Sequence, residues 1–236
     1  MGTVFSIDVR DEVASGAVDG VVRWLRWVDD TFSTYKLASA ISRVVRGERT
    51  VAECHPLVGW VLRRCQEVTW RSDGYFSAYA GGVLDPSGYV KGWAVEVASD
   101  RLRAAGSANH CVNGGGDVQC AGLAGPDRPW RVGIADPQAP GEILGAVEGT
   151  NLAVATSGTA ERGAHVLDPH TGRSAHGLLS VTLVGERLSE VDALATAAFA
   201  MGSRAVGWIE SQPGLRGLVV DEHGALRTAR SGVPTR

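Results

Sequence analysis

Apolar side chains recur along the chain with two different periods, which predict strands and helices in separate segments. Over residues 3–9 apolar and polar side chains alternate, as in a strand with one buried face. Residues 12–32 instead place apolar side chains at helical spacing, with two aspartates on another side, which is typical of an amphipathic helix. A second helix is expected to begin at His55-Pro56, because proline is tolerated in the first turn, and to end at residues 72–74.

Later segments add two helices, several short apolar strands and a final hairpin. One helix follows the turn at residues 84–88 and runs to Gly106, and another apolar helix is expected over 189–202. Helices early and late, with strands mostly in the second half, predict a mixed α+β fold in which residues 1–236 form a single domain. Strands are predicted at residues 110–113, 130–134, 152–156, 179–184 and, as a hairpin around Gly224, at 215–220 and 225–229.

Composition narrows the class of protein. The 236 residues are 44% apolar and 21% charged, the balance of an ordinary globular chain. The net charge of −3 and the lack of a basic block disfavour nucleic acid as a partner, and no apolar run is long enough to predict a transmembrane segment. The four cysteines show no CxxC spacing, so we expect reduced thiols rather than a thiolate metal site.

Candidate chemistry gathers in two stretches, residues 153–172 and 189–202. In the second stretch Asp192 and Thr196 are four residues apart, so they share one face of an apolar helix. Because an unpaired buried charge is costly, this pair is compatible with oxygen ligands for a hard divalent cation. A structural explanation competes: Asp192 caps the helix and Thr196 bonds back to a backbone carbonyl. Spacing alone leaves both explanations open.

Other polar positions also admit two explanations. Lys91 and Gly92 lie near a predicted helix N-terminus, where backbone amides favour an anion, or they are an exposed lysine and a packing glycine. The triple glycine at 114–116 fits a plain loop or a backbone lying against a flat ligand, and it lacks the GxGxxG spacing of a dinucleotide-binding unit. His165 precedes the turn at 169–172, and spacing alone favours a structural histidine there.

Short motifs follow one another along nearly the whole chain. They are M-G-T-V-F at 1–5, F-S-T-Y at 32–35, L-D-P-S-G-Y-V-K-G-W-A at 84–94, N-G-G-G-D at 113–117, P-W-R-V-G-I at 129–134, A-T-S-G at 155–158, H-V-L-D-P-H-T-G at 165–172 and D-A-L-A-T-A at 192–197. Any one of them is weak, but together and in this order they resemble the ApbE-type FAD:protein FMN transferases.

This resemblance implies a T-fold-like α+β architecture, with mixed or antiparallel sheets and packed helices. It also implies Mg²⁺-dependent transfer of FMN from FAD, through its phosphate, to a threonine or serine hydroxyl of a target flavoprotein, with release of AMP. Such chemistry requires charge neutralisation at the diphosphate and an oriented nucleophile. Some members of the family instead hydrolyse FAD to FMN and AMP.

Matching the family's motifs residue by residue gives the roles that the resemblance implies. His165 is the expected base that deprotonates the acceptor hydroxyl, a task suited to an imidazole. The residues expected to hold FAD are Met1, Tyr35, Tyr75, Phe76, Ser77, Asp85, Lys91 and Val166. The positions expected at the metal are Gly88, through its carbonyl, and Asp192, Ala195 and Thr196.

The chain also departs from the family's pattern. Members usually carry an aspartate where this chain has Ser77, which puts a nucleotide contact and the affinity for FAD in question. Many relatives have an export signal or lipid anchor ahead of the M-G-T motif, whereas here Met1 belongs to the motif, so the expected location is cytoplasmic unless residues precede it. An Mg²⁺-dependent FAD pyrophosphatase and a non-catalytic flavin-binding protein are the alternatives on the same site.

Overall fold

A central antiparallel sheet organises the fold. The computed structural model describes residues 2–159 and 166–229, and within them one sheet has the strand order β1-β2-β3-β6-β9-β10-β11, with every neighbouring pair antiparallel. The predicted α+β class with antiparallel sheets is therefore confirmed. These strands are β1 (Phe5–Val9), β2 (His110–Gly114), β3 (Asp117–Ala121), β6 (Leu152–Gly158), β9 (Leu178–Gly185), β10 (Arg216–Asp221) and β11 (Leu226–Ala229).

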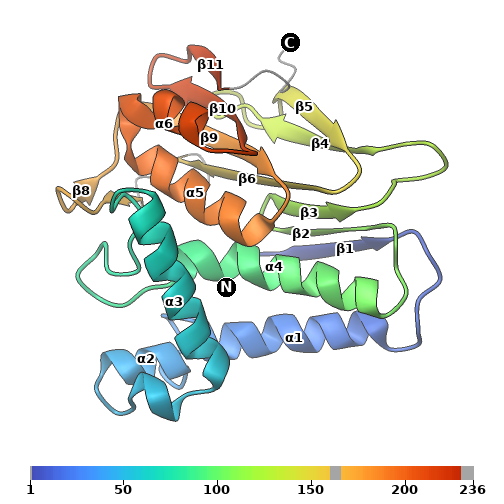
Figure 1. The fold of residues 1–236 in the computed structure, drawn as a ribbon, viewed down its shortest axis with the longest axis horizontal. Helices are drawn as coiled ribbons and strands as arrows, with labels where there is room; N and C mark the ends of the chain where they lie inside the picture. The colour runs from blue at the N-terminus through green and yellow to red at the C-terminus, as the bar shows by residue number, and fades with distance from the viewer. Residues whose placement is uncertain (1, 160–165, 230–236) are drawn as a thin grey trace.

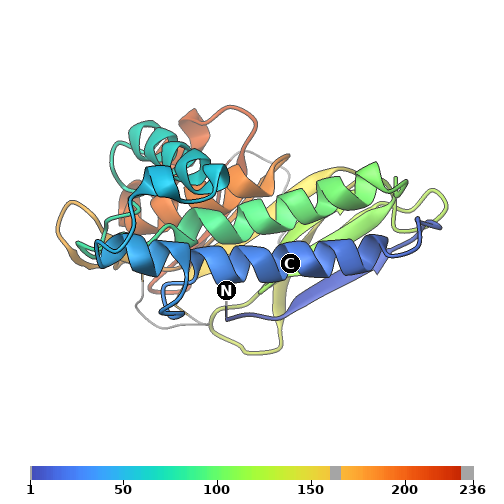
Figure 2. The same cartoon turned by 90° about the horizontal axis from the view of Figure 1, so that it is seen from below.

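The helices gather on one face of this sheet (Figure 1). Helix α4 lies between α1 and α5, and the view from below shows α1 and α4 side by side (Figure 2). The helices are α1 (Ala17–Phe32), α2 (Ala40–Val45), α3 (Pro56–Arg71), α4 (Ser87–Ala104), α5 (Leu188–Ala200) and α6 (Ala205–Ser211), with short 3₁₀ turns at Val51–Glu53 and Gly202–Arg204. Across the described residues, no helix combines the length and apolar character needed to cross a membrane.

Two small hairpins complete the architecture, and one of them covers the other face of the sheet. Because successive strand residues point to opposite faces, Ala153 and Ala155 of β6 enter the main core with the helices, whereas Val154 enters a second core. Trp130 and Val147 close that second core. They come from the hairpin of β4 (Trp130–Ala135) and β5 (Ile143–Gly149), while β7 (Leu167–Asp168) pairs with β8 (Arg173–Ser174).

Local interactions explain which predicted helix boundaries are confirmed and which differ in the structure. Helix α3 begins at Pro56 as predicted, and the His55 ring nitrogen Nδ1 accepts the N–H of Leu57 at 3.2 Å. Helix α1 begins at Ala17 rather than near residue 12, because Gly16 adopts a left-handed φ of 79° that interrupts the helix. Strand β5 and helix α6 were not predicted.

The triple glycine forms the tight turn of the β2–β3 hairpin. Gly115 and Gly116 have φ values of 61° and 90°, the positive values that a two-residue type I′ turn requires. A side chain at Gly115 would also collide with Thr3. The turn delivers Asp117 to the first position of β3, directly beside α4 and α5.

Candidate functional site

A lysine and two aspartates from three different elements meet in the interior. Lys91 lies in the second turn of α4, Asp117 begins β3, and Asp192 lies in the first half of α5. The Lys91 ammonium forms ion pairs with the Asp117 carboxylate and with Asp192 Oδ2, the latter at 3.0 Å. Both aspartates are almost fully buried, with 2% and 4% of their surface exposed. We call these three residues the Lys91 cluster.

Backbone donors fix both carboxylates of the Lys91 cluster. The N–H of Gly92 donates to Asp192 Oδ2 at 2.8 Å, and the N–H of Thr156 in β6 donates to Asp117 Oδ1 at 2.9 Å. The cluster contains one lysine and two aspartates, so its formal charge is −1. Buried charge of this kind is costly without a partner, so the cluster is suited to attract a further cation.

The close approach of α4 to α5 depends on the absence of a side chain at Gly92. A Cβ there would lie 2.5 Å from the Leu188 carbonyl oxygen and 2.7 Å from Asp192 Cβ. Real Cβ atoms do not tolerate such contacts, so glycine permits the contact that brings the Gly92 N–H to the carboxylate. Of the two explanations considered for Gly92, packing is the one that its surroundings support.

Thr196 lies one helical turn beyond Asp192. The structural explanation for this pair is confirmed for Thr196 and wrong for Asp192. The Thr196 hydroxyl donates to the Asp192 carbonyl at 3.2 Å, as the structural explanation requires, and lies 3.3 Å from the Ser157 hydroxyl of β6. The Asp192 side chain, in contrast, does not cap its own helix but faces Lys91 and Gly92.

Gly88 lies at the start of α4, close to Thr196. A Cβ at Gly88 would lie 3.1 Å from the Phe76 ring and 3.9 Å from the Thr196 methyl carbon. Ala195, the neighbour of Thr196, is fully buried. The structure therefore brings together Gly88, Lys91, Asp192 and Thr196 from the predicted site residues, with the ring of Phe76 packed against Gly88.

The donor set agrees with a hard divalent cation. The Asp192 carboxylate, the Thr196 hydroxyl and the backbone carbonyls nearby are oxygen donors of the kind that Mg²⁺ prefers. Over residues 2–159 and 166–229, no group of three histidine, cysteine, aspartate or glutamate side chains is placed to hold a metal ion. A cation at this place would therefore need hydroxyl or backbone oxygens in addition to carboxylates.

A second group of side chains surrounds Tyr75. Its ring meets the His170 ring edge-on, with centroids 4.5 Å apart, and its hydroxyl accepts a hydrogen bond from the Arg204 guanidinium at 2.7 Å. His170 in turn lies 2.9 Å, through Nε2, from the Asp73 carbonyl oxygen. The predicted turn at 169–172 is confirmed, because the N–H of Gly172 bonds the Asp168 carbonyl at 2.8 Å.

The remaining predicted site residues take up several different positions. Tyr35 is 94% exposed in the turn after α1, whereas Val166 is buried in the main core. The Ser77 hydroxyl accepts the Tyr79 N–H at 3.0 Å, and the Asp85 carboxylate accepts the Ser87 N–H at 2.9 Å, so each supports its own turn. Met1 and His165 lie outside the described residues.

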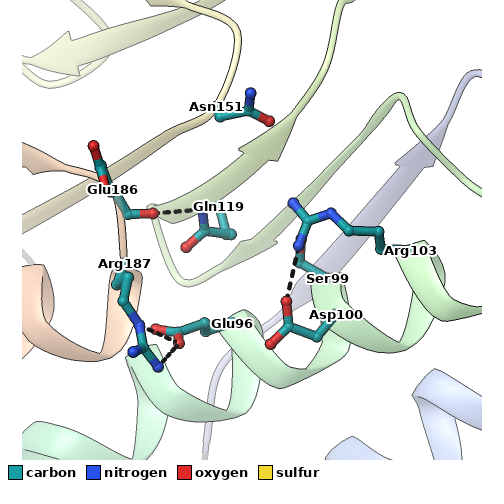
Figure 3. Close-up of a pocket in the computed structure, with 8 residues that line it drawn as sticks. All are labelled: Glu96, Ser99, Asp100, Arg103, Gln119, Asn151, Glu186 and Arg187. Carbon is teal, nitrogen blue, oxygen red and sulfur yellow. Dashed lines mark hydrogen bonds and ion pairs between the residues drawn. The ribbon is translucent and has the colours of Figure 1, made fainter.

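A polar pocket of about 490 Å³ opens between α4, β3 and the residues that precede α5 (Figure 3). Its side chains satisfy the first N–H groups of α5: Gln119 Oε1 accepts from Leu188 at 2.9 Å, and Glu96 Oε2 accepts from Ser189 at 2.9 Å. Glu96 also binds the Arg187 guanidinium at 2.6 Å, which raises the pKa of that arginine. Since helix N-termini leave such donors without partners, this pocket serves to anchor α5.

Sequence reasoning did not assign a role to Asp117 or Ser157, although both lie beside predicted site residues. The signal was present in each case. Asp117 stands between three glycines and the first apolar residue of β3, and Ser157 follows the apolar start of β6, so each is a polar residue next to an apolar segment.

Comparison with known proteins shows the family to which the chain belongs. A family profile described as "ApbE family" matches residues 1–84 and 77–219. An "FAD:protein FMN transferase" from Rhodobacter capsulatus is 37% identical over 145 residues, which is 58% of this chain and 27% of that protein. Its counterpart from Treponema pallidum is 31% identical over 178 residues, 67% of this chain and 49% of that protein. The chain thus spans less than half the length of these relatives.

Solved structures share the fold at lower sequence identity. The ApbE protein from Thermotoga maritima superposes with a TM-score of 0.88 at 22% identity, over 97% of this chain and 94% of that one. The flavin transferase ApbE from Vibrio cholerae gives a TM-score of 0.84 at 22% identity, over 97% and 93% of the two chains. At this identity the likeness concerns the fold alone.

Proposed function

Because the chain belongs to the ApbE family, we propose that it transfers FMN from FAD to a threonine or serine hydroxyl of a target flavoprotein, with release of AMP. The names of the relatives support the reaction, and one observation in this chain carries the proposal. The Lys91 cluster places a lysine and a surplus of negative charge beside the Thr196 hydroxyl in a buried position. A diphosphate and a divalent cation together match that charge pattern.

The cluster's own residues have distinct roles in this proposal. Lys91 directs its ammonium toward the diphosphate of FAD, where a fixed positive charge stabilises the charge that builds up during transfer. Asp117 is a positioning residue, because its carboxylate holds the Lys91 ammonium and is itself held by the Thr156 N–H. Both groups are therefore oriented before the substrate binds.

Asp192 and Thr196, with the backbone of Gly88 and Ala195, are the positions that would hold Mg²⁺. When bound, the ion supplies neutralising charge to the diphosphate. In the helix, the Gly92 N–H is the donor that would ordinarily serve the Gly88 carbonyl. Its bond to Asp192 reduces the demand on that carbonyl, which favours the carbonyl as an additional ligand.

The flavin nucleotide and the acceptor hydroxyl are assigned to the other predicted residues. Tyr75, held by His170 and Arg204, offers an oriented aromatic ring near the loop that carries Phe76 and Ser77. His165 is the proposed base that takes the proton from the acceptor hydroxyl, whose oxygen then attacks the FMN-side phosphorus while AMP leaves. In balance, FAD and the protein hydroxyl give the FMN ester of the protein, AMP and one proton.

Mass analysis of an acceptor tests the proposal directly. The chain is incubated with FAD, Mg²⁺ and a flavoprotein that carries a threonine or serine acceptor site, and the acceptor is weighed. A gain of one FMN is expected, together with an equal amount of AMP. Free FMN and AMP without a labelled acceptor would replace transfer by FAD hydrolysis, and the absence of AMP would leave only flavin binding.

Substitution of His165 tests the proposed base. We expect His165→Ala to bind FAD nearly as well as the parent chain, while transfer falls by about 100-fold or more, the usual contribution of a general base. The control is His223→Ala, at an exposed histidine in the β10–β11 turn, which should leave transfer unchanged. Equal turnover in both variants would remove His165 from the reaction.

A further inference from the structure

Two cysteines face each other across the β2–β3 hairpin. Cys111 of β2 and Cys120 of β3 are register partners, and their Sγ atoms lie 3.5 Å apart as free thiols. Cys120 is completely buried in the second core, whereas Cys111 is only partly buried at its edge. The pair belongs to none of the residues assigned to flavin, metal or acceptor above.

The ladder geometry at this position suits a covalent bond between the two side chains. Toward β1, the N–H of Arg10 donates to the Asn109 carbonyl and the N–H of Gly115 donates to the Val4 carbonyl. Every second residue from 109 to 115 therefore points its backbone groups toward β1. By alternation Cys111 is one of these, so it faces Cys120 as a non-hydrogen-bonded pair. Such pairs have Cα atoms about 4.5 Å apart, within the range that a disulfide spans.

The two thiols also differ in the way that exchange chemistry requires. A hydrogen bond from the Cys120 thiol and, more weakly, the Arg10 charge lower the pKa of Cys111, against burial and the nearby Asp8. The same hydrogen bond and burial raise the pKa of Cys120. The partly accessible thiol is thus the more readily ionised one, and the thiolate is the nucleophile in exchange.

We propose that Cys111 and Cys120 form a reversible cross-strand disulfide by exchange with a low-molecular-weight disulfide. The Cys111 thiolate attacks one sulfur of that disulfide and releases the other as a thiolate. The Cys120 thiol then loses its proton and attacks Cys111 Sγ, which releases the second small thiol. The protein loses two hydrogens and is oxidised, and the small disulfide is reduced to two thiols. This inference does not depend on the proposed function.

Peptide mapping tests the proposal on the intact chain. The protein is incubated with glutathione disulfide at pH 8, the remaining thiols are alkylated under denaturing conditions, and the digest is analysed without reduction. We expect one linked product that joins Cys111 to Cys120, reversed by dithiothreitol, with Cys54 and Cys65 fully alkylated. Cys65 is a matched control, because burial raises the pKa of its thiol to about 12.

Substitutions separate the two exchange steps. Cys120→Ala should accumulate a stable glutathione adduct on Cys111, whereas Cys111→Ala should accumulate neither an adduct on Cys120 nor a disulfide. Because Cys120→Ala removes a core sulfur, a second measurement uses the parent chain alone: a trivalent arsenical specific for paired thiols should bind in a ratio of about one, and oxidation should abolish binding. Full alkylation of both cysteines after glutathione disulfide treatment, or a persistent adduct in the parent chain, would overturn the proposal.

Discussion

At the scale of single residues, the Lys91 cluster depends on one ammonium shared between two buried carboxylates. Asp117→Asn removes one of these charges while its amide oxygen can still accept the Thr156 N–H bond. Lys91 then keeps Asp192 as its partner, so the cluster becomes neutral and we expect the chain to remain folded. Transfer should fall about 100-fold, because small displacements of a positioned group cost this much. Separate kcat and KM values for FAD measure the effect.

The control for this variant lies on α4, the helix that carries Lys91. Asp100→Asn removes an aspartate of α4 that is exposed, pairs with Arg103 at 2.9 Å and does not belong to the Lys91 cluster. We expect it to leave kcat and KM unchanged. If Asp117→Asn retained the kinetics of this control, Asp117 would have no positioning role.

Residues of the site differ in how far the sequence can reveal them. The neighbourhood of Asp192 and Thr196 follows from their spacing, because one helical turn fixes it locally. The partners of Lys91 do not follow from any local rule, because Asp117 reaches it only after β3 has packed against α4 and α5. Side chains that meet across elements need the tertiary fold to be found.

At the scale of elements, the position of α5 depends on caps supplied by other elements. Glu96 accepts the Ser189 N–H and binds Arg187, although it belongs to α4. Glu96→Gln keeps a neutral acceptor and loses the charged one, so we expect the free energy of unfolding to fall by about 1–2 kcal/mol, the difference typical of charged and neutral hydrogen bonds and caps. Urea unfolding at pH 7 measures it.

An exposed glutamate–arginine pair provides the comparison for Glu96. Glu148→Gln alters a surface pair in which Arg131 lies 3.5 Å away and both side chains are more than half exposed. Such pairs contribute little, so we expect a change within about 0.5 kcal/mol. A similar loss in both variants would mean that burial of Glu96 adds nothing to the anchoring of α5.

Elements that combine a clear hydrophobic period with end signals can be predicted from the sequence, and those that lack the period cannot. The proline at the start of α3 and the serine, aspartate and glycine after its end mark this helix in the sequence. Strand β5 is bounded by the turn residues Pro140 and Gly141, but it has no strict alternation, and its burial comes from pairing with β4 and covering the second core. The packing of this hairpin on the second core, which joins it to distant strands, leaves no local pattern in the sequence.

At the scale of the whole molecule, acid stability should depend on His110. This histidine is fully buried at the start of β2, and its ring nitrogens lie 2.7 Å from the Ser99 hydroxyl and 3.0 Å from the Ser107 hydroxyl. Burial, assisted by the Arg103 charge, lowers its pKa below the ordinary 6.5. As pH falls through 6.5, the unfolded chain therefore binds a proton that the folded chain does not, and folding becomes less favourable.

We therefore expect the free energy of unfolding to decrease from pH 7.5 toward pH 5 and the decrease to be smaller in His110→Gln. Unfolding by urea at intervals of half a pH unit measures both curves. His223→Gln is the control, since this histidine is 83% exposed and its replacement should leave the pH dependence as it was. Parallel curves for the parent chain and His110→Gln would remove His110 as the source of the dependence.

Because Gly92 has no side chain, a single substitution there can change the distance between α4 and α5. A methyl group at this position would act as a spacer that moves α4 away from α5, because its carbon would collide with the Leu188 carbonyl and the Asp192 side chain of α5. Such a spacer changes no ionisable group in the chain, so it varies the distance between the charges while their number stays constant. The width of the gap between α4 and α5 thereby becomes a quantity that experiment can adjust on its own.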